Sequence, residues 1–245
     1  MKNVFTFLLL LFSLLCNGQS PKLFTTDKEL SSSLINQIYQ DRNGFIWIAT
    51  EDGLNRYDGA KFTIYKHEPN NEHSLAHNFV RTVFEDSKGH LLIGTYIGIQ
   101  MYDPATDNFT PLAKLEDTGE TLESNINSFI ERKNGEIWVS GNVLCKLDIK
   151  DHLLTVRKVD IAVTSPGSLF EDKKQNVWMA KGEEGVYQLT PDNQLTLHLS
   201  KDNGYVKSIC EDQRGNIYVG SIRKGLFIYD KERKTFVPVD LKEKG

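Results

Sequence analysis

Three observations predict an all-β protein. A short motif, built around a turn and a residue three positions after it, recurs five times along the 245 residues. Each copy contains four short runs rich in β-branched and aromatic residues, and turn-forming residues separate these runs. Beyond the first 20 residues, no segment shows the sustained apolar periodicity of an amphipathic helix.

Residues 1–18 are predicted to be a secretory signal peptide. A positively charged start and the apolar run Phe5–Leu15 precede small and polar residues. This run is shorter than the roughly 20 residues that cross a bilayer as a helix. We therefore expect cleavage after Gly18 and export to the periplasm. Acylation of Cys16 is the alternative, which Leu15 disfavours because lipoprotein sites need a small side chain there.

The composition is that of an ordinary soluble domain, with 39% hydrophobic and 25% charged residues. A net charge of −4 gives no electrostatic reason to expect nucleic acid as a partner. Cys145 and Cys210 each lie in an apolar run and are predicted to be buried free thiols rather than part of a disulfide framework.

The repeated motif is an Asp-x-x-Gly turn followed, three residues after the glycine, by an aromatic or apolar residue. In such a turn the Asp bonds its own backbone and the glycine takes a positive φ. The last positions of the five copies are separated by 45, 46, 40 and 40 residues. The motif residues, all assigned to structure, are Asp41, Gly44 and Trp47, Asp86 and Gly89 (with Leu92 last), Gly135 and Trp138, Asp172 and Trp178, and Asp212, Gly215 and Tyr218.

Two copies depart from the motif. The third has Arg132 at the turn position, and the fourth has Gln175 where the others have glycine, which leaves the type of that turn open. The residue at the position of Trp47 is expected to fill the space between neighbouring blades, because the site recurs in every copy.

Each copy is predicted to form four antiparallel strands, and the first copy places them at 34–40, 45–50, 53–57 and 61–66. The fourth strand of the second copy is expected at Asn108–Leu112. A four-stranded unit of this length has the size of a β-propeller blade. The predicted blades span approximately 30–73, 74–120, 121–162, 163–202 and 203–245.

The five blades are expected to form an incomplete part of a seven-bladed propeller. Lys22–Thr26 is predicted to be a closing strand, yet the fifth copy already has its own fourth strand at Thr235–Val239. An open arc leaves strand edges and a blade face uncovered, which is costly. We therefore favour a piece of a larger sensor over a closed five-bladed protein.

The stretch Asp41–Asp58 and the lead-in Leu30–Asn36 carry a family resemblance. They resemble the two-component regulator propeller repeat. The resemblance implies a periplasmic sensor region of a hybrid two-component histidine kinase, anchored in the inner membrane in full-length relatives. It also implies oligosaccharide sensing that regulates glycan-utilisation genes, with further blades, a kinase part and a possible homodimer. The kinase and DNA-binding parts are absent from this sequence.

Alternating strand direction places the second-to-third loops and the inter-blade loops on one face, opposite the Asp-x-x-Gly turns. These loops vary from copy to copy and carry amides, carboxylates, cations and tyrosines, which suit sugar recognition. Ordinary loop polarity is the alternative for any one of them. The candidate ligand-binding residues are Thr50, Glu51, Asp52, Asn78, Thr95, Tyr96, Asn127, Asn142, Glu183, Glu184, Tyr205, Arg223 and Lys224.

No catalytic residue, cofactor or metal site is predicted. His67, His73 and His77 lie in one loop but lack a convincing ligand set. The pairs Glu51–Asp52 and Glu183–Glu184 leave acid/base chemistry open. A ligand-binding sensor is therefore the leading hypothesis. The alternatives are a propeller-fold lyase or hydrolase acting on a polysaccharide, and a protein-interaction scaffold.

Overall fold

The computed structural model of the chain describes residues 23–26, 29–199 and 204–240. The predicted signal peptide and Lys22 lie outside this part. The described residues form five β-sheets and contain no helix, so none of them belongs to a helix that could cross a membrane. The all-β prediction is confirmed.

The strands follow the chain in five groups. The first blade contains β1 (Ile35–Gln40), β2 (Ile46–Thr50), β3 (Gly53–Tyr57) and β4 (Phe62–Tyr65). The second contains β5 (Val80–Glu85), β6 (Leu91–Thr95), β7 (Ile99–Asp103) and β8 (Asn108–Phe109). The third contains β9 (Lys114–Leu115), β10 (Ser128–Glu131), β11 (Ile137–Ser140), β12 (Leu144–Lys150) and β13 (Leu153–Lys158). The fourth contains β14 (Leu169–Glu171), β15 (Val177–Lys181), β16 (Gly185–Leu189) and β17 (Leu195–Leu199). The fifth contains β18 (Tyr205–Glu211), β19 (Ile217–Ile222), β20 (Gly225–Asp230) and β21 (Thr235–Pro238).

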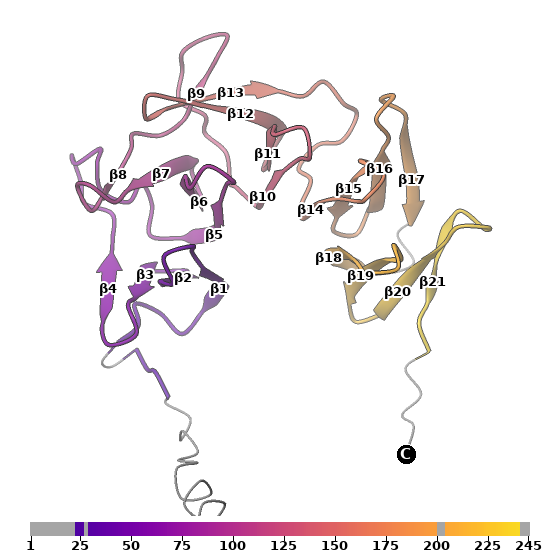
Figure 1. The fold of residues 1–245 in the computed structure, drawn as a ribbon, viewed down its shortest axis with the longest axis horizontal. Helices are drawn as coiled ribbons and strands as arrows, with labels where there is room; N and C mark the ends of the chain where they lie inside the picture. The colour runs from indigo at the N-terminus through magenta and orange to yellow at the C-terminus, as the bar shows by residue number, and fades with distance from the viewer. Residues whose placement is uncertain (1–22, 27–28, 200–203, 241–245) are drawn as a thin grey trace, which may run out of the picture.

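The five blades are arranged around an open arc (Figure 1). Within each blade, consecutive strands pair antiparallel in chain order, except for β9, which lies at the outer edge of the third blade. The first strand of every blade faces the middle of the arc, and the first and fifth blades stand at its two ends (Figure 1). The structure therefore has the blade architecture that the repeats predict.

In the first and fourth blades the turn Asp ties the hairpin to the tryptophan that follows it. In the first blade Asp41 Oδ1 accepts the backbone N–H groups of Asn43 and Phe45 at 2.9 and 3.0 Å. Asp41 Oδ2 accepts the indole N–H of Trp47 at 2.8 Å. The Trp47 side chain is fully buried. In the fourth blade, Asp172 Oδ2 likewise accepts the indole N–H of Trp178 at 2.9 Å.

The third blade supplies the carboxylate from a different position. Arg132 stands at the turn, and the indole N–H of Trp138 is donated to Glu136 Oε2 at 3.0 Å. The Arg132 guanidinium lies 4.6 Å from the centre of the Trp138 ring and pairs with Glu171 at 2.9 Å. Loss of the Asp is thus compensated by a carboxylate two residues before the tryptophan.

The fourth blade keeps the turn geometry without its glycine. Gln175 has a φ of 66° and donates its backbone N–H to Asp172 O at 2.9 Å. Gly44 has a φ of 89° and donates to Asp41 O at 3.0 Å. The turn type that the sequence left open is therefore the same, with a glutamine in the left-handed region.

The aromatic residues of the motif fill the spaces between blades. Trp47 packs with Val80, Ile93 and Tyr102 of the second blade. Trp178 packs with the fifth blade in the same manner. The core is therefore a series of apolar layers between successive blades.

A second contact joins each blade to the next at the turn end. The residue after the turn Asp, or after Arg132 in the third blade, donates its backbone N–H to a glutamate that ends the next blade's first strand. The pairs are Arg42 with Glu85 (2.8 Å), Ser87 with Glu131 (2.7 Å), Lys133 with Glu171 (2.7 Å) and Lys173 with Glu211 (3.2 Å). The first blade has Gln40 at the glutamate position.

The predicted fourth strand of the second blade is too long. Strand β8 ends at Phe109 because the Thr110 hydroxyl accepts the backbone N–H of Met101 at 3.0 Å and interrupts the ladder. The chain then leaves for the third blade, where β9 pairs in parallel with the outermost strand β13. That sheet therefore has five strands.

Two further expectations are corrected. Residues 23–26 form no strand, and Phe24 instead packs against the rings of Tyr57 and Phe62 on the first blade. Cys145 is a buried free thiol, whereas Cys210 is free and exposed. Cys210 lies on β18, in the last of the described blades.

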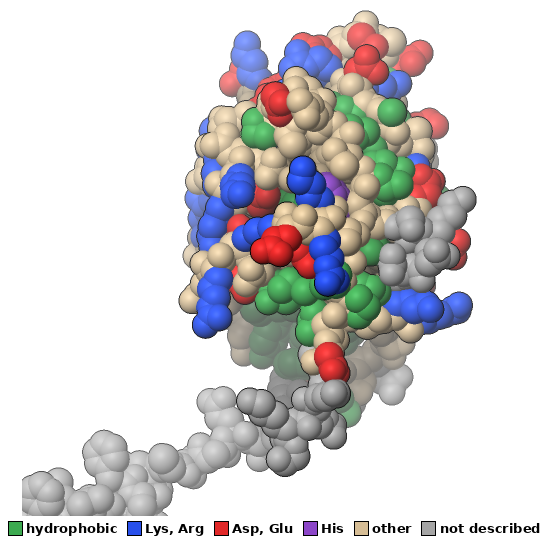
Figure 2. Space-filling view, turned by 90° about the vertical axis from the view of Figure 1, so that its right-hand side faces the viewer, with side chains coloured by type: hydrophobic (Ala, Val, Ile, Leu, Met, Phe, Trp, Pro, Cys, Tyr) green, Lys and Arg blue, Asp and Glu red, His purple; other side chains and the backbone are tan. Residues whose placement is uncertain are grey.

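The outer side of the fourth and fifth blades carries Lys and Arg side chains interspersed with Asp and Glu (Figure 2). Hydrophobic side chains are visible toward the lower end of this view. Mixed charge of this kind is typical of a solvated surface.

Replacing Asp41 by Ala should lower the free energy of unfolding by about 2–4 kcal/mol, because three donors lose a buried acceptor. The matched control is Asp58→Ala. Asp58 makes two backbone hydrogen bonds of 2.8 Å at an exposed turn, so its loss should cost clearly less than that of Asp41. Chemical denaturation measures both, and equal losses would contradict the role of the buried carboxylate.

Replacing Gln175 by Gly should raise the free energy of unfolding by about 0.5–1 kcal/mol, because it removes a side chain from a left-handed position. The reverse change, Gly215→Gln, alters the same turn of the fifth blade, where φ is 79°, and should be destabilising. Thermal and urea unfolding test the pair. A Gln175→Gly variant no more stable than the parent would contradict this reasoning.

Glu136 should give the third blade a pH-dependent stability. Burial opposes its ionisation, but hydrogen bonds from Lys146, Trp138 and Asn134 prevail and lower the pKa of Glu136 to about 2. Because the folded pKa is depressed, the stabilisation is full above the ordinary value of 4.5 and is lost as the pH falls through 2.

The stability difference between the wild type and Glu136→Gln should therefore be largest near neutral pH and should shrink steadily in acid. Unfolding free energies measured from about pH 6 down to about pH 2.5 check this. A difference that stays constant over the range would mean that the Glu136 carboxylate does not contribute through its charge.

Candidate functional site

The first strands of the first, second and fifth blades begin with a β-bulge at the end opposite the Asp-x-x-Gly turn. In the first, second and fifth blades the register slips at Asn36, Arg81 and Lys207, which have no partner residue on the second strand. At the same place in the third and fourth blades, the backbone N–H groups of Asn127 and Gly167 donate to the carbonyls of Ser140 and Ala180 on the second strand, at 2.8 and 2.7 Å. A bulge bends the strand and re-aims its side chain.

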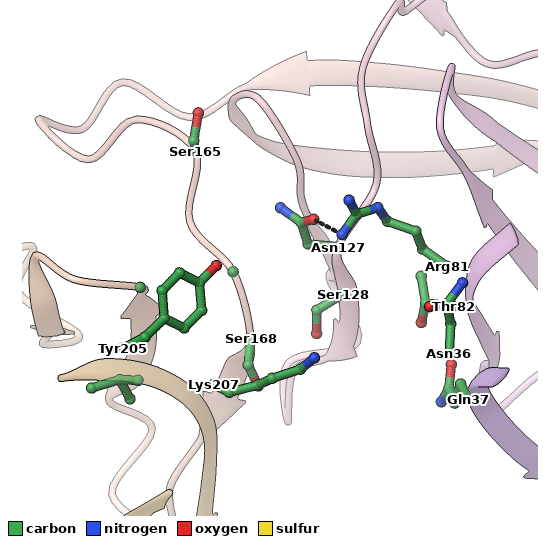
Figure 3. Close-up of a pocket in the computed structure, with 13 residues that line it drawn as sticks. Asn36, Gln37, Arg81, Thr82, Asn127, Ser128, Ser165, Ser168, Tyr205 and Lys207 are labelled. Atoms are coloured by element: carbon green, nitrogen blue, oxygen red, sulfur yellow. Dashed lines mark hydrogen bonds between the residues drawn. The ribbon is translucent and has the colours of Figure 1, made fainter. Parts of the chain in front are cut away.

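These residues surround a cavity of about 360 Å³ in the middle of the arc (Figure 3). Ligand pockets typically have volumes of about 300–1,000 Å³. All five blades contribute to its wall. The lining residues are Asn36, Gln37, Arg81, Thr82, Asn127, Ser128, Ser165, Gly167, Ser168, Gly182, Tyr205, Val206 and Lys207.

Hydrogen bonds to the neighbouring blade hold several of these polar side chains. Asn36 Nδ2 donates to Val80 O at 2.8 Å, and Gln37 Oε1 accepts the backbone N–H of Val83 at 2.7 Å. Asn127 Nδ2 donates to the carbonyl of Pro166 at 3.1 Å. The amides of the cavity wall are therefore held in place before any ligand arrives.

Tyr205 forms one side of the cavity mouth and is half exposed. Its ring lies over Gly182, where an added Cβ would come within 2.8 Å of the ring. Gly182 also has a φ of 49°, and its carbonyl accepts the backbone N–H of Val206 at 2.9 Å. Glycine at this position therefore allows the Tyr205 ring to lie close to the backbone at the entrance of the cavity.

A second hollow adjoins the cavity at Tyr205. It is lined by Ser165, Lys181, Gly182, Glu183 and Glu184 together with the tyrosine. Lys181 Nζ pairs with Glu184 at 2.8 Å. Four predicted residues therefore lie together in this region: Asn127, Glu183, Glu184 and Tyr205.

Thr50 and Thr95 do not lie on the accessible face, contrary to expectation. Both side chains are fully buried. The Thr50 hydroxyl donates to Gly53 O at 2.8 Å, and the Thr95 hydroxyl donates to Gly98 O at 3.1 Å. They close the turn between the second and third strands, which explains a polar residue at this position.

The remaining predicted residues lie on loops away from the cavity wall. Asp52 pairs with Lys66 at 2.5 Å and accepts from Asn78 Nδ2 at 3.1 Å, while Glu51 beside it is exposed. Tyr96 is half exposed and contacts the rings of His77 and Phe79. Asn142 lines a separate hollow, and Arg223 and Lys224 form an exposed turn of the fifth blade.

The sequence reasoning missed most of the cavity wall, including Asn36, Gln37, Arg81, Ser168 and Lys207. A signal was present in the repeat. Nearly every copy places polar residues at the start of its first strand, beside apolar residues that enter the core. Aligning the copies on their turns brings Asn36, Arg81 and Lys207 to one position.

The histidines of the long second-blade lead-in serve local structure. The Nδ1 atoms of His67 and His73 lie 2.9 and 3.2 Å from the carbonyls of Leu75 and Phe109. The search for metal-ligating clusters in the described part of the chain finds none.

Comparison with known proteins identifies the repeat. The family model "Two component regulator propeller" matches residues 29–52, 74–96 and 200–223. A curated relative, histidine kinase P4 of Formosa agariphila, is 37% identical over 83 residues, which are 31% of this chain and 6% of that protein. The chain thus corresponds to a small part of this relative.

Solved structures share the fold. A structure described as the extracellular domain of a hybrid two-component system from B. thetaiotaomicron aligns with a TM-score of 0.72 and 18% identity, over 90% of this chain and 33% of that one. Virginiamycin B lyase from Staphylococcus aureus aligns with a TM-score of 0.62 and 13% identity, over 88% of this chain and 71% of that one. At such identities the likeness concerns the fold alone.

The three segments that match the family model lie in the first, second and fifth blades, each of which is a four-stranded sheet. The chain carries sequences similar to the two-component regulator propeller repeat at residues 29–52, 74–96 and 200–223.

Proposed function

We propose that this chain is the ligand-binding part of an extracytoplasmic sensor in a hybrid two-component system, and that its ligand is an oligosaccharide. The similarity to a histidine kinase and to extracellular domains of such systems supports the sensor role. The proposed ligand site is the cavity in the middle of the arc. On this proposal the chain is periplasmic, exported by the predicted signal peptide.

One observation carries the proposal: five successive blades converge on one polar cavity through the residues at the start of their first strands, three of which are bulged there. The wall offers amide groups from Asn36, Gln37 and Asn127, and hydroxyl groups from Ser128 and Ser168. Amides and hydroxyls both donate and accept, as sugar hydroxyls require of their partners.

Tyr205 adds an aromatic face at the mouth of the same cavity. An exposed tyrosine combines an apolar ring surface with a polar tip, and a sugar ring presents both kinds of surface. Convergent polar groups beside an aromatic side chain favour a saccharide over a purely apolar ligand.

Signalling belongs to the larger protein in this proposal. The remaining blades and a kinase part belong to a longer sensor chain, which is anchored in the inner membrane, works as a homodimer and controls glycan-utilisation genes. A propeller-fold lyase or hydrolase and a protein-interaction scaffold are the alternatives that the experiment below separates from a sensor.

Replacing Tyr205 by Ala should weaken oligosaccharide binding at least about tenfold, which corresponds to about 1.4 kcal/mol. Calorimetric titration against an array of oligosaccharides measures this. Tyr96→Ala is the matched variant, because Tyr96 is equally exposed on the same face but does not line the cavity. It should bind as the wild type does.

Saccharide binding that Tyr205→Ala leaves unchanged would contradict the site. Binding of none of the oligosaccharides would contradict the sensor proposal itself. Product analysis of the same mixtures separates a sensor from an enzyme, since bond cleavage or elimination would favour a lyase or hydrolase.

A further inference from the structure

The cavity is cationic, although the whole chain has a net charge of −4. Two of its lining residues, Arg81 and Lys207, carry positive charge, and none of the described lining residues is an Asp or a Glu. Both come from the bulge position, on the second and the fifth blade. They enter the cavity from opposite sides (Figure 3).

Arg81 is held in place without a carboxylate partner. Its Nη1 donates to Asn127 Oδ1 at 3.3 Å, and its guanidinium carbon lies 5.4 Å from the centre of the Phe79 ring. Its Nε is buried and has no hydrogen-bond partner. A buried donor left in this condition costs free energy, which a ligand that accepts from it would recover.

Other arginines of the chain do find carboxylates. Arg42 pairs with Glu85 at 2.5 Å, Arg56 with Asp107 at 2.9 Å and Arg132 with Glu171 at 2.9 Å. Arg81 instead has an amide and a ring as neighbours. Its environment orients the guanidinium and leaves its charge uncompensated within the described residues.

Lys207 provides the second charge. Its side chain is exposed, extends into the cavity toward Ser128 (Figure 3) and forms no ion pair within the described part of the chain. The adjoining hollow holds Lys181 paired with Glu184, and Glu183 beside them. Those acids lie beyond Tyr205, so the two cations of the cavity stay without a counter-charge on its own wall.

We propose that the cavity takes an acidic saccharide, one that carries a carboxylate or a sulfate group, and that Arg81 and Lys207 bind this group. The proposal rests on the oligosaccharide-binding function proposed above and specifies its ligand. A guanidinium presents donors in a fork that matches the oxygens of either anion. Hydrogen bonds between charged partners are roughly twice as strong as those between neutral ones.

The orienting contacts also favour a ligand of this class. Asn127 binds Arg81 through its oxygen and Pro166 O through its nitrogen, so the guanidinium is positioned from the neighbouring blade. A neutral sugar would leave two cations facing one cavity. An anionic group relieves their repulsion, and electrostatic complementarity of this kind sets specificity.

The experiment compares each acidic oligosaccharide with its own neutralised form. Uronate-bearing oligosaccharides are titrated before and after reduction of their carboxyl groups to primary alcohols, and sulfated ones before and after desulfation. We expect the acidic forms to bind at least about tenfold more tightly, and their affinity to fall as salt rises. The two arms distinguish a carboxylate from a sulfate.

Lys207→Gln and Arg81→Gln should each weaken binding of the acidic form about tenfold and leave the neutralised form unaffected. Lys174→Gln is the matched control, because Lys174 is an exposed lysine at the turn end of the fourth blade. It should bind as the wild type does. Because the Lys207 side chain is exposed, its replacement should not disturb folding. The Lys207→Gln variant therefore tests the proposal even if Arg81→Gln fails to fold.

Two results would overturn the inference and leave the sensor function standing. One is equal binding of the acidic and neutralised forms by the wild type. The other is unchanged binding of the acidic form by Lys207→Gln. If no oligosaccharide binds in either form, the proposed function fails together with it.

Discussion

The carboxylate at the turn of each blade is the interaction on which the rest of this structure depends. In the first blade it accepts two backbone N–H groups and one indole N–H, so it fixes the hairpin and the ring at once. The ring then fills the space against the next blade. Because a buried carboxylate without partners is costly, its second oxygen needs a partner. That partner is an indole N–H in the first and fourth blades and the His90 ring in the second, where Leu92 replaces the aromatic residue. Glu136 in the third blade shows that the requirement is for the carboxylate, not for its place in the chain.

The two ends of each blade have different roles. At the turn end, buried carboxylates and the glutamate contacts between blades fix the geometry. At the other end, a bulge in the first, second and fifth blades releases one residue from pairing, so its side chain can change without disturbing the core. Asn36, Arg81 and Lys207 occupy that position. A rigid scaffold whose binding residues can vary suits the recognition of different ligands.

The repeat predicts the blades because its determinants are local: Asp41 and Trp47 lie six residues apart, and their bond forms within one hairpin. The parallel pairing of β9 was not predictable in this way, since its partner lies some 40 residues further along the chain. Thr50 and Thr95 were misplaced because a hydroxyl that closes a turn looks like a polar loop residue. The cavity wall was missed because the polar residues that mark it stand out only when the copies are aligned on their turns, and a bulge changes the direction in which such a side chain points.

The path of β9 has a consequence for how such propellers diversify. Repeats of this kind are natural units of duplication and exchange between genes. Here, the outermost strand of the third blade is paired with residues that precede its own repeat. Exchange of that repeat alone would strip Thr155 and Val156 of their neighbours and expose a strand edge. The second and third blades would therefore be inherited together, as one unit.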